Sequence, residues 1–257
     1  MTRVDLNCDM GESYGAFTIG NDAAVFPFIT SANIACGFHG GDPGVMRRTV
    51  LAAVQYGVAI GAHPGLPDLI GFGRREMAVT AQDVYDMVVY QVGALRAVAT
   101  AASTQLRHVK PHGALYNMAA AQPVLATAIA HAIRDTDPAL RLVGRAGSAL
   151  IAAGRAASLI TASEVFADRH YQADGALVSR SLDNAVIASV DEAVQRAIEM
   201  VRHHRVTAID GTTIAIQADT LCVHGDAPHA PALVRELRSA LASAGVDVRP
   251  LDADTAA

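Results

Sequence analysis

The stretch Ser31-Ala-Asn-Ile-Ala-Cys-Gly-Phe-His39-Gly-Gly-Asp42-Pro43 contains the end of one structural element and the start of the next. Its apolar first half is typical of a buried β-strand. The pair Asp42-Pro43 is typical of a helix N-cap followed by proline in the first turn, and Gly57 is placed to end that helix. A strand that passes through a glycine turn into a helix predicts an α/β fold with a parallel sheet and helices outside it.

Three other histidines share the arrangement of His39. Each ends a short apolar run and is followed at once by glycine or proline; they are His63, His112 and His224. The junction Val4-Asp-Leu-Asn7-Cys-Asp9-Met-Gly-Glu12 has the same form with acids. Such side chains project at the carboxyl edge of the strands, where α/β barrels carry out their chemistry. A single histidine of this kind is more often structural, but four with an acidic junction indicate one ionisable site, and therefore an enzyme.

The alternation of strand and helix patterns runs through the whole chain. Strands are expected at Arg3–Cys8, Ser31–Gly37, Val58–Ala62, Leu106–Lys110, Arg141–Gly144, Leu159–Ser163 and Thr220–His224. Helices are expected from Asp42-Pro43, from the capping boxes Thr80-x-x-Asp83 and Ser189-x-x-Glu192, and from Pro123 and Pro231. Residues 206–216 interrupt the pattern as a β-hairpin on a type I′ Asp210-Gly211 turn.

We therefore predict a single (β/α) barrel of about seven parallel strands, with a small β-hairpin excursion. One domain spans residues 1–257, with its core at about 3–246, because no linker or low-complexity segment divides the chain. No G-x-G-x-x-G motif follows a strand, which disfavours a dinucleotide-binding fold. Neither a G-x-x-x-x-G-K-[S/T] phosphate loop nor a G-x-S-x-G serine elbow occurs.

Composition restricts the class of protein further. The net charge of −5 and the sequence pI of about 6.0 give no basic footprint for nucleic acid. No uncharged run approaches the ~18 residues of a membrane span, and no signal-peptide core precedes the first strand. The three cysteines, without CxxC spacing, suit a reducing compartment. We expect a cytoplasmic protein that binds neither nucleic acid nor membrane; a homo-oligomer stays possible.

Two pairs of residues are candidates for acid–base and charge chemistry. Asp9 and Glu12 lie three apart across a glycine, so both carboxylates can face one cavity and either can act as a general base. The alternative is a turn in which Asp9 accepts from backbone N–H groups. Lys110 and His112 stand two positions apart and can share a strand face. Because lysine is rarely buried unless paired, Lys110 is a candidate to stabilise an oxyanion or a phosphate.

A metal site and an anion site are open alternatives. Asp9, His39, His63 and His112 are ligand types, and three of them around one divalent ion would make a hydrolytic site. No H-x-x-x-H or H-E-x-x-H spacing supports this, although spacing is uninformative when each ligand comes from its own strand. The pair Arg74-Arg75 either binds a carboxylate or phosphate or fixes its loop by a salt bridge.

Seven segments in order make the chain resemble the LamB/YcsF family. They are DLNCDMGE (5–12), SANIACGFHGGDP (31–43), GAHPGLPDLIGFGRR (61–75), YQVGAL (90–95), HVKPHGALYN (108–117), EVFADRHY (164–171) and CVHGD (222–226). The resemblance implies the seven-stranded (β/α) barrel of glycoside hydrolases and polysaccharide deacetylases. It also implies the A subunit of a 5-oxoprolinase, an enzyme that opens 5-oxo-L-proline to L-glutamate with hydrolysis of ATP and that also contains B and C subunits.

The implied reaction assigns roles to the candidate residues. Opening a phosphorylated lactam requires a base for water, a cation near the oxygen and an acid for the ring nitrogen. We expect Asp9 as base beside Glu12, Lys110 as cation, and one of His39, His63 or His112 as acid. Residues expected to contact the substrate are Asn7, Arg74, Arg180, His224 and Asp226, with Arg74 or Arg180 holding its carboxylate. Since the chain lacks a phosphate loop, ATP is expected to act as co-substrate on the partner subunits. A metal-dependent deacetylase or amide hydrolase acting alone, and a lactam-binding module, are the alternatives.

Overall fold

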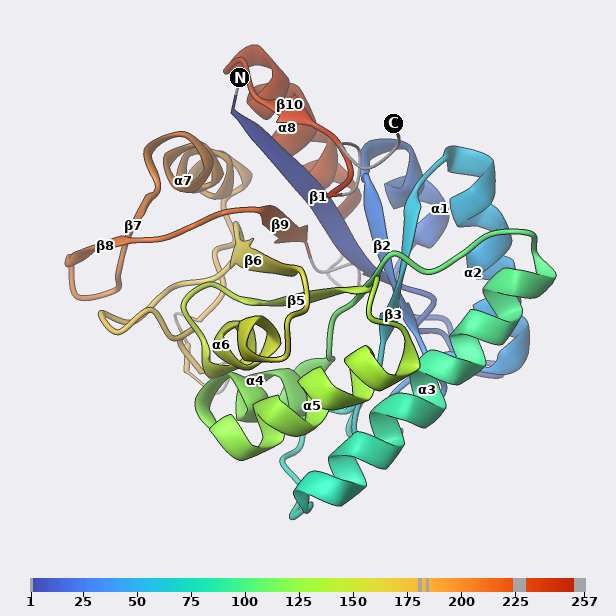
Figure 1. The fold of residues 1–257 in the computed structure, drawn as a ribbon. Coiled ribbons are helices and arrows are strands. Elements are labelled where there is room, and N and C mark those ends of the chain that lie inside the picture. Colours follow the sequence, from blue (N-terminus) through green and yellow to red (C-terminus); the bar gives the residue numbers. More distant parts are fainter. Residues whose placement is uncertain (1, 180–181, 184, 224–229, 252–257) are drawn as a thin grey trace.

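A closed sheet of seven parallel strands forms the centre of the computed structural model, which describes residues 2–179, 182–183, 185–223 and 230–251 (Figure 1). The strands are β1 (Arg3–Met10), β2 (Ser31–Ala35), β3 (Ala59–His63), β4 (His108–Val109), β5 (Arg141–Arg145), β6 (Thr161–Phe166) and β9 (Thr220–Val223). Each pairs in parallel with the next, and β1 also pairs with β9, which closes the ring. The predicted α/β barrel is therefore confirmed.

Helices surround the barrel and cover its outer face (Figure 1). They are α1 (Asp22–Val25), the 3-10 turn η1 (Phe26–Phe28), α2 (Pro43–Tyr56), α3 (Ala81–Ala101), α4 (Gly113–Ala121), α5 (Pro123–Thr136), α6 (Ala149–Ala156), α7 (Val190–His203) and α8 (Ala230–Ser243). Asp42 caps α2 by accepting from the N–H groups of Gly44 and Val45, and Gly57 ends it in the left-handed conformation. Thr80 and Asp83 form the predicted capping box of α3. Within the described part of the chain, no helix combines the length and apolar character of a membrane span.

Some elements differ from the expectation. The strand expected over Leu106–Lys110 is reduced to β4, and the short helices α4 and α6 were not predicted. A further strand, β10 (Asp247–Val248), pairs with the start of β1. The hairpin is present as β7 (Arg205–Thr207) and β8 (Thr213–Ala215), but the type I′ turn is wrong. Such a turn requires positive φ at both central residues, and only Gly211 has it, at 88°.

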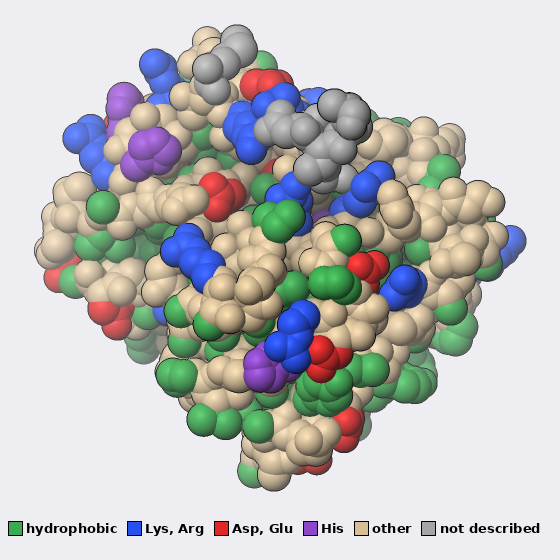
Figure 2. All heavy atoms as spheres, in the orientation of Figure 1, with side chains coloured by type: hydrophobic (Ala, Val, Ile, Leu, Met, Phe, Trp, Pro, Cys, Tyr) green, Lys and Arg blue, Asp and Glu red, His purple; other side chains and the backbone are tan. Residues whose placement is uncertain are grey.

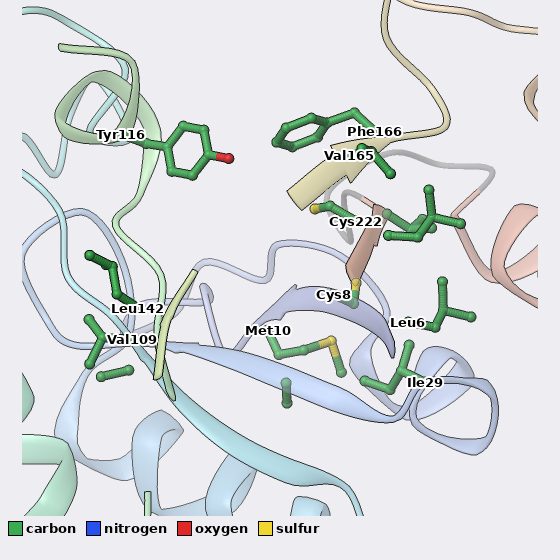
Figure 3. Close-up of a cluster of buried hydrophobic side chains, with 14 of the residues drawn as sticks. Leu6, Cys8, Met10, Ile29, Val109, Tyr116, Leu142, Val165, Phe166 and Cys222 are labelled. Atoms are coloured by element: carbon green, nitrogen blue, oxygen red, sulfur yellow. The ribbon is translucent and has the colours of Figure 1, made fainter. Parts of the chain in front are cut away.

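The barrel is polar inside and apolar outside. Along β1 the side chains of Leu6, Cys8 and Met10 belong to the hydrophobic core between sheet and helices, where Figure 3 shows them with Val109 and Leu142. The alternate side chains, Asp5, Asn7 and Asp9, point to the opposite face and are buried too. This pattern places charged groups in the interior of the barrel, where each needs a partner.

A hydrogen-bonded chain across the interior supplies such partners. His108 lies 2.7 Å from the Oδ1 of Asn33, and the Nδ2 of Asn33 donates to Asn7 at 2.7 Å and to Asp9 at 2.9 Å. Burial lowers the pKa of His108 to about 3, so this ring is neutral and acts as a donor to Asn33. Gly61 leaves the room for it, since a Cβ there would lie 2.0 Å from the ring. The chain fixes the position of the Asp9 carboxylate.

Candidate active site

A cavity of about 510 Å³ opens at the carboxyl ends of the barrel strands. Its lining includes five of the residues expected to do chemistry, namely Asp9, Glu12, His63, Lys110 and His112. They come from β1, β3 and β4 and the turns that follow those strands. On the face of the molecule seen in Figure 2, acidic, basic and hydrophobic side chains are interspersed.

Lys110 lies at the centre of the cavity floor and is the only lysine of the chain. It is 3% exposed, and its Nζ lies 2.8 Å from Asp9 Oδ1, 3.0 Å from Glu164 Oε1 and 3.0 Å from Cys222 Sγ. Burial acts to lower the pKa of Lys110, but Asp9, Cys222 and Glu164 together raise it well above the usual 10.5. Lys110 is therefore a permanent ammonium held between two carboxylates.

Glu164 belongs to this group, although the sequence reasoning did not nominate it. Its side chain is fully buried; Oε1 accepts from Lys110 and from Asn7 at 3.1 Å, and Oε2 accepts from the hydroxyl of Tyr116 at 2.7 Å. A carboxylate inside the otherwise uncharged strand β6 was the available signal. Glu164 shares the positive charge of Lys110 with Asp9.

A second group, the His–Glu cluster, consists of Glu12, His39, His63 and His112. One possible ligand atom from each lies within 4.8 Å of those of the other three. Glu12 Oε1 lies 3.2 Å from His39 Nε2, 3.4 Å from His112 Nδ1 and 4.0 Å from His63 Nε2. His39 and His112 stack face to face, with ring centroids 3.6 Å apart. Gly73 allows this stack, because a Cβ there would lie 2.7 Å from His39 and 2.8 Å from His112.

In His63 and His112, the ring nitrogen that points away from the cluster has a backbone carbonyl partner, which decides the tautomer of the neutral ring. His63 Nδ1 lies 2.7 Å from the carbonyl oxygen of Lys110, and His112 Nε2 lies 2.8 Å from that of Phe72. Because a carbonyl only accepts, both outer nitrogens carry the proton and both inner nitrogens present lone pairs when the rings are neutral. Those inner nitrogens, His63 Nε2 and His112 Nδ1, are 3.0 Å apart. A proton or a cation between them would offset the repulsion of the two lone pairs.

The electrostatics favour a positive charge at that position. Burial, followed by the neighbouring histidines, lowers the pKa values of His39 and His112 well below 6.5, so these rings are neutral. Around Lys110 and the His–Glu cluster, the three buried carboxylates of Asp9, Glu12 and Glu164 then outnumber the single ammonium. A divalent cation would compensate that excess of negative charge, and imidazole with one carboxylate is a donor set suited to zinc.

The ligand atoms also have suitable spacing. Donors about 2.0 Å from a tetrahedral ion lie about 3.3 Å from one another, close to the separations within the His–Glu cluster. Other separations are longer, such as the 4.0 Å between Glu12 Oε1 and His63 Nε2. The carboxylate of the cluster is Glu12, whereas the sequence pointed to Asp9. Asp9 Oδ2 is 3.4 Å from His63 Nε2, but Asp9 Oδ1 is bound by Lys110 and Asn33. The residues present therefore fit a divalent metal.

The other residues that the sequence predicted for the site do not all line the cavity. His39 and Asn7 are buried behind the cavity wall and do not line it. Arg74 lines the cavity with its guanidinium 5.0 Å from the centre of the Phe72 ring, whereas Arg75 pairs with Asp68 and fixes the loop. Arg180, His224 and Asp226 lie outside the described residues.

Chemically, the site combines the parts of a hydrolytic centre. Asp9 is a fixed carboxylate at the cavity surface, Lys110 is an ammonium beside it, and the His–Glu cluster brings His63 Nε2 within 3.4 Å of Asp9 Oδ2. A carboxylate can take a proton from water, and an ammonium stabilises negative charge that develops on a carbonyl oxygen. The arrangement suits attack of water on an amide or ester carbon.

Comparisons with known proteins agree over nearly the full length. The model of the LamB/YcsF family matches residues 4–256. The 5-oxoprolinase A subunit of Tolumonas auensis is 59% identical over 251 residues, which cover 98% of this chain and 100% of that protein. The crystal structure of the lactam utilization protein from Thermus thermophilus is 49% identical, with a TM-score of 0.91 over 96% of this chain and 99% of the other. A family 4 carbohydrate esterase from Streptomyces lividans shares only the fold, at 13% identity and a TM-score of 0.50 over 96% of this chain and 91% of that one.

Proposed function

Because the chain belongs to the LamB/YcsF family, we propose that it works as the A subunit of a 5-oxoprolinase, which opens 5-oxo-L-proline to L-glutamate with hydrolysis of ATP. The identity of 59% over the full length of a 5-oxoprolinase A subunit carries this proposal. The cavity supports it, since a carboxylate and an ammonium 2.8 Å apart are what hydrolysis of an activated amide requires.

The proposed reaction begins with activation of the lactam. Transfer of the γ-phosphoryl group of ATP to the lactam oxygen, with loss of the ring N–H proton, makes the carbonyl carbon electrophilic. The chain has no G-x-x-x-x-G-K-[S/T] loop, so we assign this step to the B and C subunits. The activated lactam then occupies the cavity with its phosphorylated oxygen beside Lys110, whose charge offsets that of the phosphate.

Ring opening then depends on proton transfers from water to the ring nitrogen. Water adds to the ring carbon as Asp9 takes one of its protons, and the electron pair of the C=N bond goes to the ring nitrogen. Loss of phosphate from this intermediate would only regenerate the lactam, so the C–N bond must break first. Cleavage of the C–N bond requires two protons on nitrogen: an imidazolium of the His63–His112 pair would supply one and Asp9 returns the other, while the hydroxyl group of the intermediate gives its proton back to the imidazole as the C=O bond forms. A second water hydrolyses the resulting acyl phosphate to L-glutamate and phosphate.

The division of labour is tested by reconstitution. The purified chain alone is expected to hydrolyse neither ATP nor 5-oxoproline, whereas the chain with candidate B and C subunits is expected to form one glutamate per ATP. Glutamate by an enzyme-coupled assay and ADP by chromatography are the measurements. Robust ATP-coupled turnover by the chain alone would contradict the division of labour. Tight binding of 5-oxoproline without turnover in the complex would favour a lactam-binding module, and release of acetate from an acetylated sugar without ATP would favour a deacetylase.

We also propose that the His–Glu cluster binds a divalent cation in competition with the shared proton. Glu12, His63 and His112 would hold it, which would leave the fourth position open to the substrate. A cation there would act as a Lewis acid on the substrate oxygen. The protein contribution is the fixed orientation of the rings by the carbonyl groups of Lys110 and Phe72.

Zinc is expected to stabilise the metal-free chain. At a free concentration 100 times the dissociation constant, binding to the folded state alone raises the free energy of unfolding by about 2.7 kcal/mol. Thermal unfolding with and without zinc measures this, and Glu12→Gln is expected to abolish most of the shift. Asp68→Asn, which changes a buried carboxylate of the Arg75 ion pair, is the matched control and keeps the zinc-dependent shift. An unchanged melting temperature of the wild type in zinc, manganese and magnesium would rule out the cation site.

A further inference from the structure

The wall of the cavity opposite the His–Glu cluster carries arginine. Arg145 and Arg169 line it together with the segment 176–179. Arg169 is buried and donates to the carbonyl groups of Val178 at 2.5 Å and Ala185 at 3.2 Å, so it fixes this segment in place. Arg145 is half-buried, and one of its amino groups donates to the carbonyl of Gly175. The two arginines therefore differ in the access that the cavity has to them.

The position of Arg145 in the sheet places it beside the site. It is the last residue of β5 and lies in register with Glu164 on β6. Side chains in register on neighbouring strands share a face of the sheet, and Glu164 points into the barrel toward Lys110. Arg145 thus lines the cavity that Lys110 lines, one strand away from Glu164, which is one of the two carboxylates that hold Lys110.

The charge of Arg145 is available to a ligand. Its hydrogen bond goes to a backbone carbonyl, and the acid beside it, Glu164, already accepts from Lys110, Asn7 and Tyr116. Arg74, the other cavity arginine that is not buried, stacks over the Phe72 ring at the exposed part of the loop. Of the two cavity arginines that are not buried, Arg145 is therefore the one that lies on the barrel sheet, in register with Glu164.

We infer that Arg145 binds the carboxylate of the substrate and makes the site selective for lactams that carry one. This rests on the proposed function. In 5-oxo-L-proline the carboxylate and the carbonyl are carried by the two carbons that flank the ring nitrogen. A ring whose oxygen faces Lys110 can thus direct its carboxylate to Arg145 on the neighbouring strand. Guanidinium binds carboxylate through two parallel hydrogen bonds, which also fixes the orientation of the ring.

The test compares ligands with and without the carboxylate. Calorimetry measures binding of 5-oxoproline, of 2-pyrrolidinone, which is the same ring without a carboxylate, and of inorganic phosphate; steady-state kinetics follow in the reconstituted complex. Arg145→Met is expected to weaken binding of 5-oxoproline and to raise its KM about 10- to 100-fold, with binding of 2-pyrrolidinone unchanged. Arg145→Lys, which retains the charge, is expected to show a smaller loss. Arg141→Met is the matched control, because Arg141 lies at the opposite end of β5 and lines a different pocket.

Three binding outcomes would overturn the inference. Equal loss of 5-oxoproline and 2-pyrrolidinone would mean that Arg145 only supports the wall through Gly175. Loss of phosphate binding alone would assign Arg145 to the phosphate of the activated lactam. No loss of either ligand would leave Arg145 without a part in binding. If the wild-type complex forms no glutamate although the difference between the two lactams depends on Arg145, the proposed function fails and carboxylate recognition stands.

Discussion

Replacing Lys110 with methionine is expected to lower turnover of the reconstituted complex about 10²–10³-fold, the loss typical of removing one charge-stabilising donor. The same change is expected to destabilise the chain by about 3–5 kcal/mol, because it leaves a buried carboxylate without its counter-charge. Glu164 is fully buried and accepts from Lys110 at 3.0 Å, so it is the group left unpaired. Turnover and denaturant-induced unfolding measure the two effects.

A second variant separates the two roles of Lys110. In the double variant Lys110→Met with Glu164→Gln, the uncompensated charge is gone, so stability is expected to recover in part. Turnover is expected to stay low, because the cation near the substrate oxygen is still absent. Recovery of turnover along with stability would mean that Lys110 acts only by neutralising Glu164. A stable Lys110→Met protein with near-normal turnover would rule out both roles.

Asp9→Asn is expected to reduce turnover about 10²–10⁴-fold, the range for loss of a general base. Stability should change less than in Lys110→Met, because Lys110 keeps its ion pair with Glu164. The amide also retains a side-chain oxygen that can accept from Lys110 and Asn33, as Asp9 Oδ1 does now. The measurements are turnover in the complex and the melting temperature of the chain.

Asp5→Asn provides the control for this prediction. Asp5 is a buried carboxylate on the same strand, but it accepts from Thr30, Ser31 and Thr220 at the other end of the barrel interior. This variant is expected to keep its turnover. If Asp9→Asn is nearly as active as the wild type, water is activated by another group, and Glu12 would be the next acid to test.

The fold was predictable from the sequence where local signals are strong. Asp42 with Pro43, and Thr80 with Asp83, use short-range hydrogen bonds that need no knowledge of the rest of the chain, and both helix starts are confirmed. Helix α4 was missed because it begins directly after His112 without a side-chain cap. The strand expected over Leu106–Lys110 is assigned only as β4, although the backbone N–H groups of Arg107 and Lys110 still donate to the carbonyl groups of Ile60 and Ala62.

The candidate site was predictable only as a set of strand ends. The strand-then-turn pattern predicted that Asp9, His63, Lys110 and His112 line one cavity, as they do. It did not predict how deeply each side chain is buried. It did not distinguish His39, which is fully buried, from His63, which lines the cavity. Which carboxylate pairs with which cation depends on the register between strands that are far apart in sequence. For this reason the sequence did not identify Glu164 as a partner of Lys110. For the same reason it named Asp9, and not Glu12, as the carboxylate of the metal site.

The single lysine of the chain gives direct spectroscopic access to the site. Since Lys110 is the only lysine and is 3% exposed, protein grown with ¹⁵N-labelled lysine carries one side-chain ammonium resonance, and it reports from the cavity floor. Burial between Asp9 and Glu164 slows exchange of its protons with water, which favours detection of a signal that is usually lost at the surface. Arrival of a lactam, a nucleotide-bearing partner or a metal ion can then be followed at one nitrogen, without assignment of the remaining spectrum.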